Sequence, residues 1–404
     1  MLSRTLGTPG RADEPSRPLD RRAAPAGAWR GEEPLTNPRP STSVPVAVVV
    51  SAHGFGHAAR ACSVIEAMAE RRPDLRFEII TTVPRWFFAE SLTAPFSLHR
   101  FTTDVGLAQR TPLEEDLGAT ADRLDRLLAG GGRLERLAER IGRLRCRAVL
   151  ADIAPLGIAA AHRLGIPAVL VENFTWDWIY DGYGGLEPRL ARHGAALAAL
   201  SATADLHIQT EPACRPVGSA LAVPPVARRR RAAPAAVRRS LGIPDQARLV
   251  VLTMGGVGWT YRGLAPAERH RRAWFAVPGG AQRMRRRGRV VLLPFHSELY
   301  HPDLVQAADV VVGKLGYSTV AETYQARAAM AFLSRPRFRE SAVLADFVRR
   351  TAPSVEITEA DFNDGTWLGA VDGLLDAPRP GDPRVNGAPA AAAAILDRFG
   401  DVLR

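Results

Sequence analysis

Lysine is almost absent from this chain of 404 residues. Of the 53 basic residues, 52 are arginines and Lys314 is the single lysine, against 42 acidic residues, which leaves a formal net charge of +11. A surface that binds nucleic-acid phosphates usually mixes both types, because lysine is a good point charge for phosphate. Arginine throughout an alanine-rich chain is instead typical of the codon bias of a GC-rich bacterial genome. We therefore expect no specific nucleic-acid partner, while a general affinity for anions and peripheral contact with an anionic membrane stay open.

Cysteine and long apolar runs are scarce as well. Cys62, Cys146 and Cys214 show no pairing pattern, which excludes a disulfide scaffold and a cysteine-based zinc site. No run approaches the ~18 apolar residues of a membrane-spanning helix, and the first residues lack the apolar core of a secretory signal. With 46% hydrophobic residues and a mean hydropathy of −0.08, the composition predicts a globular protein of the reducing cytoplasm.

Two stretches of alternating strand and helix patterns follow a polar start. Residues 1–43 combine seven arginines and five acids with many Pro, Gly and Ala, which predicts a disordered tail. We expect one α/β domain over 44–225, a linker at 226–235, a second α/β domain over 236–385 and a C-terminal helix over 386–404. Strands are expected at 44–51, 77–83, 148–152, 168–172, 249–254, 274–277, 290–293, 309–312 and 329–333. Because helices separate them, each domain should be a doubly wound parallel sheet, and the two should enclose an interdomain cleft at the carboxyl ends of their strands.

Two arginine clusters lie outside the expected strands. Arg228–Arg231 stands among prolines and is expected to be an exposed, solvated linker, with an anion-binding patch as the alternative. The cluster Arg283–Arg289 is expected to be a solvated surface.

The first candidate site is the turn His53-Gly54-Phe55-Gly56-His57, between the first strand and a helix that runs to Arg71. The two glycines permit a tight turn, and the helix offers free N–H groups and the positive end of its dipole. That dipole favours the neutral form of an imidazole, which can accept a proton. A histidine that only packs in the turn is the alternative. The spacing fails the dinucleotide fingerprint, because Asp74 does not end a second strand, so hydride transfer is a poor fit.

The second candidate site is Gly313-Lys314-Leu315-Gly316-Tyr317-Ser318-Thr319, which joins a strand to a helix that contains Glu322. The hydroxyls of Ser318 and Thr319, with the free N–H groups of the first helical turn, form a cradle suited to a diphosphate. Lys314 adds a formal charge, and its place as the single lysine indicates a need for a compact ammonium. Simple helix capping that involves Glu322 is the alternative. The pattern is not a Walker A loop.

A third segment, Asn173–Tyr180, gathers two tryptophans, an acid and a tyrosine after a strand. Aromatic faces with polar groups suit a sugar acceptor. An aromatic loop that fills the core is an equal alternative, and Asp177 is the residue that packing explains least.

Four separated motifs, in order, resemble those of a known family: His53–Ala58, Asp152-Ile-Ala-Pro155, Asn173–Tyr180 and Gly313–Glu322. Over roughly residues 46–400 the chain resembles the nucleotide-sugar-dependent GT-B glycosyltransferases, such as the UDP-glycosyltransferases and the glucosaminyltransferase of peptidoglycan synthesis. It is most similar to the glycosyltransferase-like N-terminal region of plant L-arabinokinases. The galactokinase-type half of those proteins has no counterpart in these residues, so the resemblance implies no sugar phosphorylation.

The resemblance implies two tandem Rossmann-like domains, the first mostly for the acceptor and the second mostly for the nucleotide sugar. It implies that His57 is the catalytic base and that Asp152 orients it. The donor would be bound by Gly255, Gly256, Gly313, Lys314, Gly316, Tyr317, Ser318, Thr319, Glu322 and Glu340. The acceptor would meet His53, Gly54, Gly56, Asn173, Trp176 and Asp177. No metal or cofactor is implied, because the helix dipole and Lys314 would meet the charge of the leaving diphosphate.

Two departures from the family pattern concern the donor residues. Gly-Lys stands where such enzymes usually have a histidine and glycines, and the acidic pair expected near residue 340 is reduced to Glu340. The leading interpretation is a glycosyltransferase with an unidentified acceptor. The alternatives are a non-catalytic nucleotide-sugar sensor, a GT-B epimerase and, last, an arginine-driven nucleic-acid binder.

Overall fold

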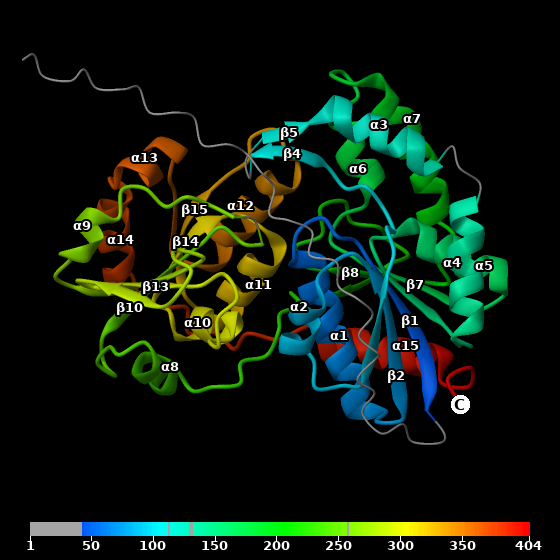
Figure 1. Ribbon diagram of the computed structural model, residues 1–404, viewed down its shortest axis with the longest axis horizontal. Coiled ribbons are helices and arrows are strands. Elements are labelled where there is room, and N and C mark those ends of the chain that lie inside the picture. The colour runs from blue at the N-terminus through cyan, green and yellow to red at the C-terminus, as the bar shows by residue number, and fades with distance from the viewer. Residues whose placement is uncertain (1–42, 112–113, 129–131, 257) are drawn as a thin grey trace, which may run out of the picture. The chain divides into compact units, whose positions relative to one another are not determined.

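The computed structural model describes residues 43–111, 114–128, 132–256 and 258–404 (Figure 1). By its internal contacts the chain divides at residue 36, and every described residue belongs to the unit Asn37–Arg404. The expected disordered tail, residues 1–43, lies outside the described residues except for Ser43.

The first half of this unit forms a seven-stranded sheet in the order β3-β2-β1-β6-β7-β8-β9, with every neighbouring pair parallel. Its strands are β1 Val44–Val50, β2 Leu75–Thr81, β3 Phe96–Arg100, β6 Val149–Asp152, β7 Ala168–Glu172, β8 Leu206–Thr210 and β9 Leu221–Val223. The uninterrupted apolar run of β1 is buried along nearly its whole length, as expected for a central strand covered by helices on both faces.

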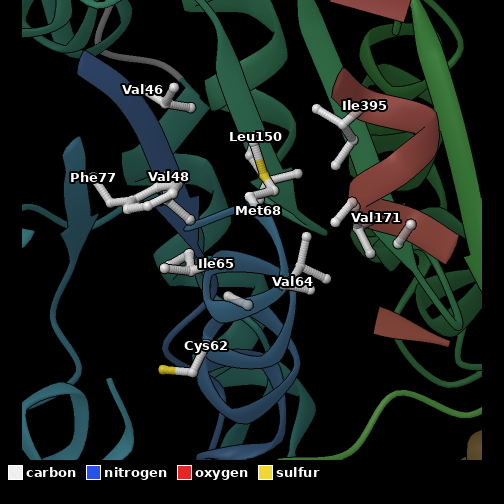
Figure 2. Close-up of a cluster of buried hydrophobic side chains, with 14 of the residues drawn as sticks. Val46, Val48, Cys62, Val64, Ile65, Met68, Phe77, Leu150, Val171 and Ile395 are labelled. Carbon is white, nitrogen blue, oxygen red and sulfur yellow. The ribbon is translucent and has the colours of Figure 1, made fainter. Parts of the chain in front are cut away.

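Helices cover both faces of this first sheet, and a short hairpin accompanies them. They are α1 Gly56–Arg71, α2 Arg85–Ser91, α3 Leu117–Leu128, α4 Gly132–Arg143, α5 Pro155–Leu164, α6 Trp176–Asp181 and α7 Pro188–Ser201, with the hairpin β4 Ala108–Thr111 and β5 Glu114–Asp116. Helix α1 carries Val64, Ile65 and Met68 onto the sheet (Figure 2), and Cys62 belongs to the same buried cluster.

The C-terminal helix α15 (Ala388–Phe399) packs on the first sheet, although the second half of the chain precedes it in sequence. Its Ile395 joins Val171 of β7 and Leu150 of β6 in one buried cluster (Figure 2). The chain therefore returns to its first core after completing the second.

The second half forms another seven-stranded sheet, in the order β12-β13-β11-β10-β14-β15-β16. Its strands are β10 Arg248–Thr253, β11 Ala273–Pro278, β12 Arg285–Arg287, β13 Val290–Leu293, β14 Val310–Lys314, β15 Ala329–Leu333 and β16 Ser354–Glu356. Its helices are α8 Pro234–Ser240, α9 Ala265–Glu268, α10 His301–Ala307, α11 Tyr317–Ala326, α12 Glu340–Thr351, α13 Glu359–Asp364 and α14 Trp367–Asp376. All neighbouring pairs are parallel except β12 with β13.

The predicted α/β architecture with two tandem Rossmann-like sheets is confirmed. The sequence prediction missed the hairpin strands β4 and β5 and the sheet strands β3, β8, β9, β12 and β16. The five sheet strands lie at or next to the sheet edges, where the apolar runs are short or broken by polar residues. The arginines of β12 are exposed, in agreement with the solvated surface expected over Arg283–Arg289. Among the described residues no helix is both long and apolar enough to cross a membrane.

The linker prediction was wrong at Arg228. Its side chain is buried rather than solvated, because Nε donates to Glu322 Oε1 at 3.0 Å and Nη1 donates to Ser91 Oγ at 3.0 Å. A buried carboxylate such as that of Glu322 needs a compensating charge, and Arg228 supplies it.

Candidate functional site

A cavity of about 660 Å³ lies between residues from the carboxyl ends of the two sheets, and we call it the two-sheet cavity. Its lining comes mainly from the turn after β1, the end of β14 with the segment that follows it, and the segment after β15, with further residues from β4 and from the segments after β7 and β10. The expected site residues that line it are His53, Gly54, Gly56, His57, Gly255, Gly256, Lys314, Gly316, Tyr317, Ser318, Thr319 and Glu340. The predicted interdomain cleft is therefore present, and both candidate glycine turns face it.

The turn after β1 positions the two histidines. Gly54 has a φ of +75°, in the left-handed region that only glycine adopts at little cost, and it lets the chain turn sharply into α1. No side chain of the described ranges caps the N-terminus of α1, which leaves N–H groups of its first turn available to a ligand. His57 lies in that first turn and is buried apart from the edge that lines the cavity.

His57 belongs to a buried ionic network. Its Nδ1 lies 3.1 Å from Asp152 Oδ1, and Asp152 ends strand β6. Arg60, one turn further along α1, donates to both oxygens of Asp152, from Nε at 2.8 Å and from Nη2 at 2.6 Å. Arg60 also donates to Asn173 Oδ1 at 2.7 Å, and Asn173 Nδ2 donates to Glu340 Oε1 at 2.8 Å. A continuous set of hydrogen bonds thus links the first sheet to the N-terminus of α12 in the second half.

The hydrogen-bond partners assign opposite tautomers to the two histidines. The Leu107 N–H donates to His53 Nδ1 at 3.3 Å, so Nδ1 is unprotonated and the neutral ring carries its proton on Nε2. Burial, together with the charges of Arg335 and Lys314, holds the pKa of His53 well below its usual value, which keeps the ring neutral. At His57, Nδ1 lies 3.1 Å from Asp152 Oδ1 and 3.3 Å from Arg60 Nη2. Because Arg60 Nη2 already donates to Asp152 at 2.6 Å and a carboxylate oxygen can only accept, we assign the Nδ1 proton to the bond with Asp152, which leaves a lone pair on Nε2. His57 can accept a proton in the cavity, whereas His53 can only donate one.

A second helix N-terminus faces the first across the cavity. Gly316 precedes α11 in an extended conformation, and no side chain caps the helix. A Cβ placed on Gly56 of α1 would lie 3.8 Å from Ser318 Oγ and 3.9 Å from the Ser318 backbone nitrogen. The free N–H groups and positive dipole ends of α1 and α11 therefore converge on one space, which favours an anion there.

Lys314 ends β14 and lines the same space. Burial, reinforced by the positive charge of Arg335 and partly offset by Glu340, lowers its pKa to about 7. An ammonium in this setting gains much more from an anionic ligand than an exposed lysine would, because it has little water to lose.

A second cavity of about 710 Å³ adjoins the first, and we call it the aromatic cavity. The two share the walls formed by Phe55, Gly255, Gly256, Ser318 and Thr319. Much of the remaining lining is apolar or aromatic and comes from Trp86, Phe87, Pro278, Phe295, Leu299 and Leu304. Three lining side chains can ionise, namely Glu90, Arg228 and His301. The sequence offered no signal for this cavity, because its aromatic residues come from two segments far apart in the chain.

Several expected site residues lie behind the cavity rather than on it. Asp152 contacts the cavity residue His57 and also binds Arg60. Asn173 bonds to Arg60 and to the cavity residue Glu340. Gly313 lies within β14, where a Cβ would come 1.8 Å from Thr253 O of the neighbouring strand, so it serves the close packing of β14 on β10. Glu322 is buried, and its two oxygens meet Arg228 at 3.0 Å and His301 Nδ1 at 3.1 Å.

Trp176 and Asp177, which were expected at the acceptor, line neither the two-sheet cavity nor the aromatic cavity. Trp176 stacks on Tyr180 with ring centroids 5.6 Å apart, and its indole N–H donates to Asp104 at 2.9 Å. Asp177 accepts from Arg215 Nη2 at 2.7 Å. The alternative of an aromatic loop that fills the core describes this segment, apart from Phe174, which reaches the two-sheet cavity.

Three lining residues of the two-sheet cavity carried no signal in the sequence: Gln109, Arg335 and Phe338. No group of three or more His, Cys, Asp or Glu side chains within the described ranges is arranged to hold a metal ion.

The two sheets and the cavity between them define the GT-B fold. The calicheamicin glycosyltransferase CalG4 superposes with a TM-score of 0.58 at 14% identity, covering 89% of this chain and 98% of that one. A UDP-glucosyltransferase from Polygonum tinctorium gives 0.54 at 14% identity, over 91% and 94% of the two chains. MurG of Acinetobacter baumannii gives 0.51 at 14% identity, over 88% and 99%.

In sequence, the chain is similar to the L-arabinokinase of Arabidopsis thaliana. The two share 26% identity over 372 residues, which cover 87% of this chain and 34% of that protein. The chain thus spans about a third of the length of this relative. No family model matches the chain.

Proposed function

We propose that this protein transfers a sugar from a nucleoside diphosphate sugar to an acceptor hydroxyl. The observation that carries this proposal is the meeting of two uncapped helix N-termini and Lys314 beside the free Nε2 of His57. Helix N-termini and an ammonium stabilise a diphosphate, and a neutral imidazole removes a proton from a hydroxyl. The fold shared with a UDP-glucosyltransferase supports a nucleotide sugar as the donor class.

The order of strands in the second sheet orients the donor. The diphosphate cradle follows β14, with β10 on one side and β15 on the other. The aromatic cavity is lined from the β10 side and suits a flat, partly polar base, while Arg335 and Glu340 follow β15. The nucleoside then occupies the aromatic cavity, and the sugar occupies the two-sheet cavity beside His57.

In the proposed mechanism, His57 Nε2 takes the proton of the acceptor hydroxyl as that oxygen attacks the anomeric carbon. The bond from the anomeric carbon to the diphosphate breaks, and the charge of the leaving group is met by the α11 N–H groups, the Ser318 and Thr319 hydroxyls and Lys314. The turn His53–Gly56 lies on the acceptor side, where the Nε2–H of His53 can donate to a second acceptor oxygen. These groups would act without a metal ion.

Thermal unfolding against UDP, dTDP, GDP and their hexose conjugates, run in EDTA, tests the donor proposal. A ligand at 100 times its dissociation constant stabilises the folded protein by about 2.7 kcal/mol. We expect one nucleotide family to raise the melting temperature in EDTA. If no nucleotide raises the melting temperature, with or without added magnesium, the proposed donor class is wrong. If a nucleotide does so only when magnesium is added, the proposal that donor binding needs no metal ion is wrong.

A second prediction concerns pH and Lys314. Its pKa is lowered to about 7 in the empty cavity, and a bound diphosphate favours the charged form, so binding takes up a proton when the pH exceeds 7. Affinity for a nucleotide sugar, whose diphosphate does not titrate in this range, is therefore highest below pH 7. It should fall by up to about 10-fold per pH unit above it.

Titration calorimetry from pH 6.5 to 9 measures this slope. Lys314→Arg, which stays charged throughout, and Lys314→Met, which is never charged, should both give flat profiles, with the methionine variant binding more weakly. A flat profile for the unchanged protein would contradict the assignment of Lys314 to the diphosphate.

A non-catalytic nucleotide-sugar sensor is the second candidate. Arg60 holds both oxygens of Asp152, so the negative charge that would support His57 as a base is already balanced. A binding protein needs no such support. The turnover of the unchanged protein and of His57→Ala separates the two candidates, because a sensor binds the donor without turning it over.

A further inference from the structure

Arg335 has a buried guanidinium that makes no hydrogen bond to the part of the chain that the structure describes. It follows β15, is 5% exposed and lines the two-sheet cavity. Within the described residues its Nε has no partner, and the nearest carboxylate oxygen, Glu340 Oε2, is 3.9 Å from Nη2, beyond hydrogen-bond distance. Since a guanidinium carries five donors and leaving a buried donor unpaired is costly, this group is expected to have a ligand.

The protein stacks this guanidinium on an aromatic ring and gives it a long ion pair with Glu340 at 3.9 Å, but no hydrogen bond within the described residues. Its Cζ lies 3.7 Å from the centroid of the Phe338 ring, a stacking contact that fixes the plane of the fork. Glu340 Oε1 accepts a hydrogen bond from Asn173 Nδ2. The carboxylate of Glu115 acts on Arg335 through its charge, but within the described residues it forms neither a hydrogen bond nor an ion pair with the guanidinium. Lys314 is the other cation of the lining. Lys314 and Arg335 are thus two cations that share the cavity with the carboxylate of Glu340.

The backbone of Arg335 lies beside the diphosphate cradle rather than in it, although its side chain lines the same cavity. Lys314 pairs with Leu333 at the ends of the neighbouring strands β14 and β15, and Arg335 follows two residues later. Adjacent strands are about 4.8 Å apart, so Arg335 lies one strand beyond the cradle, on the side away from the aromatic cavity. That is the side on which the proposed function puts the sugars.

We propose that Arg335 binds the carboxylate of a hexuronic acid, so that a sugar used at this site is a uronate. A planar guanidinium and a planar carboxylate match through two parallel hydrogen bonds, a match that Lys314 cannot offer. The carboxylate is carried either by the transferred sugar of the donor or by the acceptor. This inference rests on the proposed function for the place of the sugars.

Paired ligands that differ by the carboxylate test this inference by titration calorimetry. The donor arm compares UDP-glucuronate and UDP-galacturonate with UDP-glucose and UDP-galactose, and GDP-mannuronate with GDP-mannose. The acceptor arm compares free glucuronate and galacturonate with the neutral hexoses, in the presence and absence of UDP or GDP. Each is run on the unchanged protein, on Arg335→Gln and Arg335→Lys, and on the matched control Arg337→Gln, whose exposed arginine lies outside the cavity.

We expect the unchanged protein and the Arg337→Gln control to bind one uronate about 10- to 100-fold more tightly than its neutral partner. Arg335→Gln should remove this preference, and Arg335→Lys should restore only part of it. Affinity for the nucleoside diphosphate should stay within about threefold, which also shows that the variants fold. A preference in the donor arm puts the carboxylate on the transferred sugar, and one in the acceptor arm puts it on the acceptor.

Equal affinity for uronates and neutral sugars in both arms would overturn the inference, as would a preference that survives in Arg335→Gln. If no nucleotide binds at all, the proposed function fails. Binding of free uronates that depends on Arg335 would then still support a carboxylate site, and its absence would overturn that too.

Discussion

His57→Ala should lower the turnover of a nucleotide sugar by about 10²- to 10⁴-fold and leave its affinity nearly unchanged. His57 Nε2 is the imidazole nitrogen in the two-sheet cavity that presents a lone pair, since Nδ1 donates to Asp152 at 3.1 Å. The diphosphate cradle is built by α11 and Lys314, which this change does not touch. The release of nucleoside diphosphate by slow hydrolysis of the donor measures turnover without knowledge of the acceptor, and calorimetry measures affinity.

His53→Asn is the matched control for this experiment. Its amide oxygen can accept the Leu107 N–H in place of His53 Nδ1, and His53 is assigned no role as a base. We expect at most about a 10-fold loss of turnover from this variant. An equal loss from both variants, or none from His57→Ala, would show that the base is misassigned. Donor binding without any turnover in the unchanged protein would favour the sensor.

Asp152→Asn should destabilise the protein by about 3–5 kcal/mol, the cost of leaving a buried charge without its partner. Arg60 and Asp152 are 0% and 1% exposed, and two hydrogen bonds join them. The neutral amide can replace at most one of these bonds and none of the charge. Urea unfolding followed by tryptophan fluorescence measures the loss, since Trp86 and Trp176 lie in the same half of the chain.

The double variant Arg60→Met with Asp152→Asn is the control for charge. It removes both charges while a side chain of similar length fills the space, so it should recover much of the lost stability. The amide oxygen introduced at position 152 can still accept from His57 Nδ1, which keeps the ring oriented. A single variant as stable as the unchanged protein would show that Arg60 and Asp152 do not form the buried pair described.

The two candidate turns were predictable from the sequence because both follow apolar runs of strand length. The carboxyl ends of parallel strands converge on one edge of a sheet, so His53–His57 after β1 and Lys314–Thr319 after β14 were expected at ligand-binding edges. The resemblance to GT-B enzymes implied that the two edges face each other. Central strands were predicted well for the same reason: burial on both faces leaves an uninterrupted apolar signal.

The partners of these residues were not predictable. Arg60 looked like any polar residue on a helix, and its partner Asp152 is 92 residues away. A single sequence shows no pairing at that distance. Arg335 carried no signal among 52 arginines, and its importance comes from its burial and its lack of a hydrogen bond. Arg228 was misjudged because a run of four arginines among prolines is usually solvated, whereas one of them is needed by Glu322.

The most direct test is a crystal structure of the protein with a bound nucleotide sugar. The ligand is the nucleotide sugar that raises the melting temperature most. We expect the diphosphate oxygens within hydrogen-bond distance of the Ser318 and Thr319 N–H groups and of Lys314 Nζ. We also expect the base in the aromatic cavity beside Phe295 and the sugar within reach of His57. A nucleotide bound outside these two cavities, or bound with its base beside His57 and its sugar in the aromatic cavity, would contradict the proposed function.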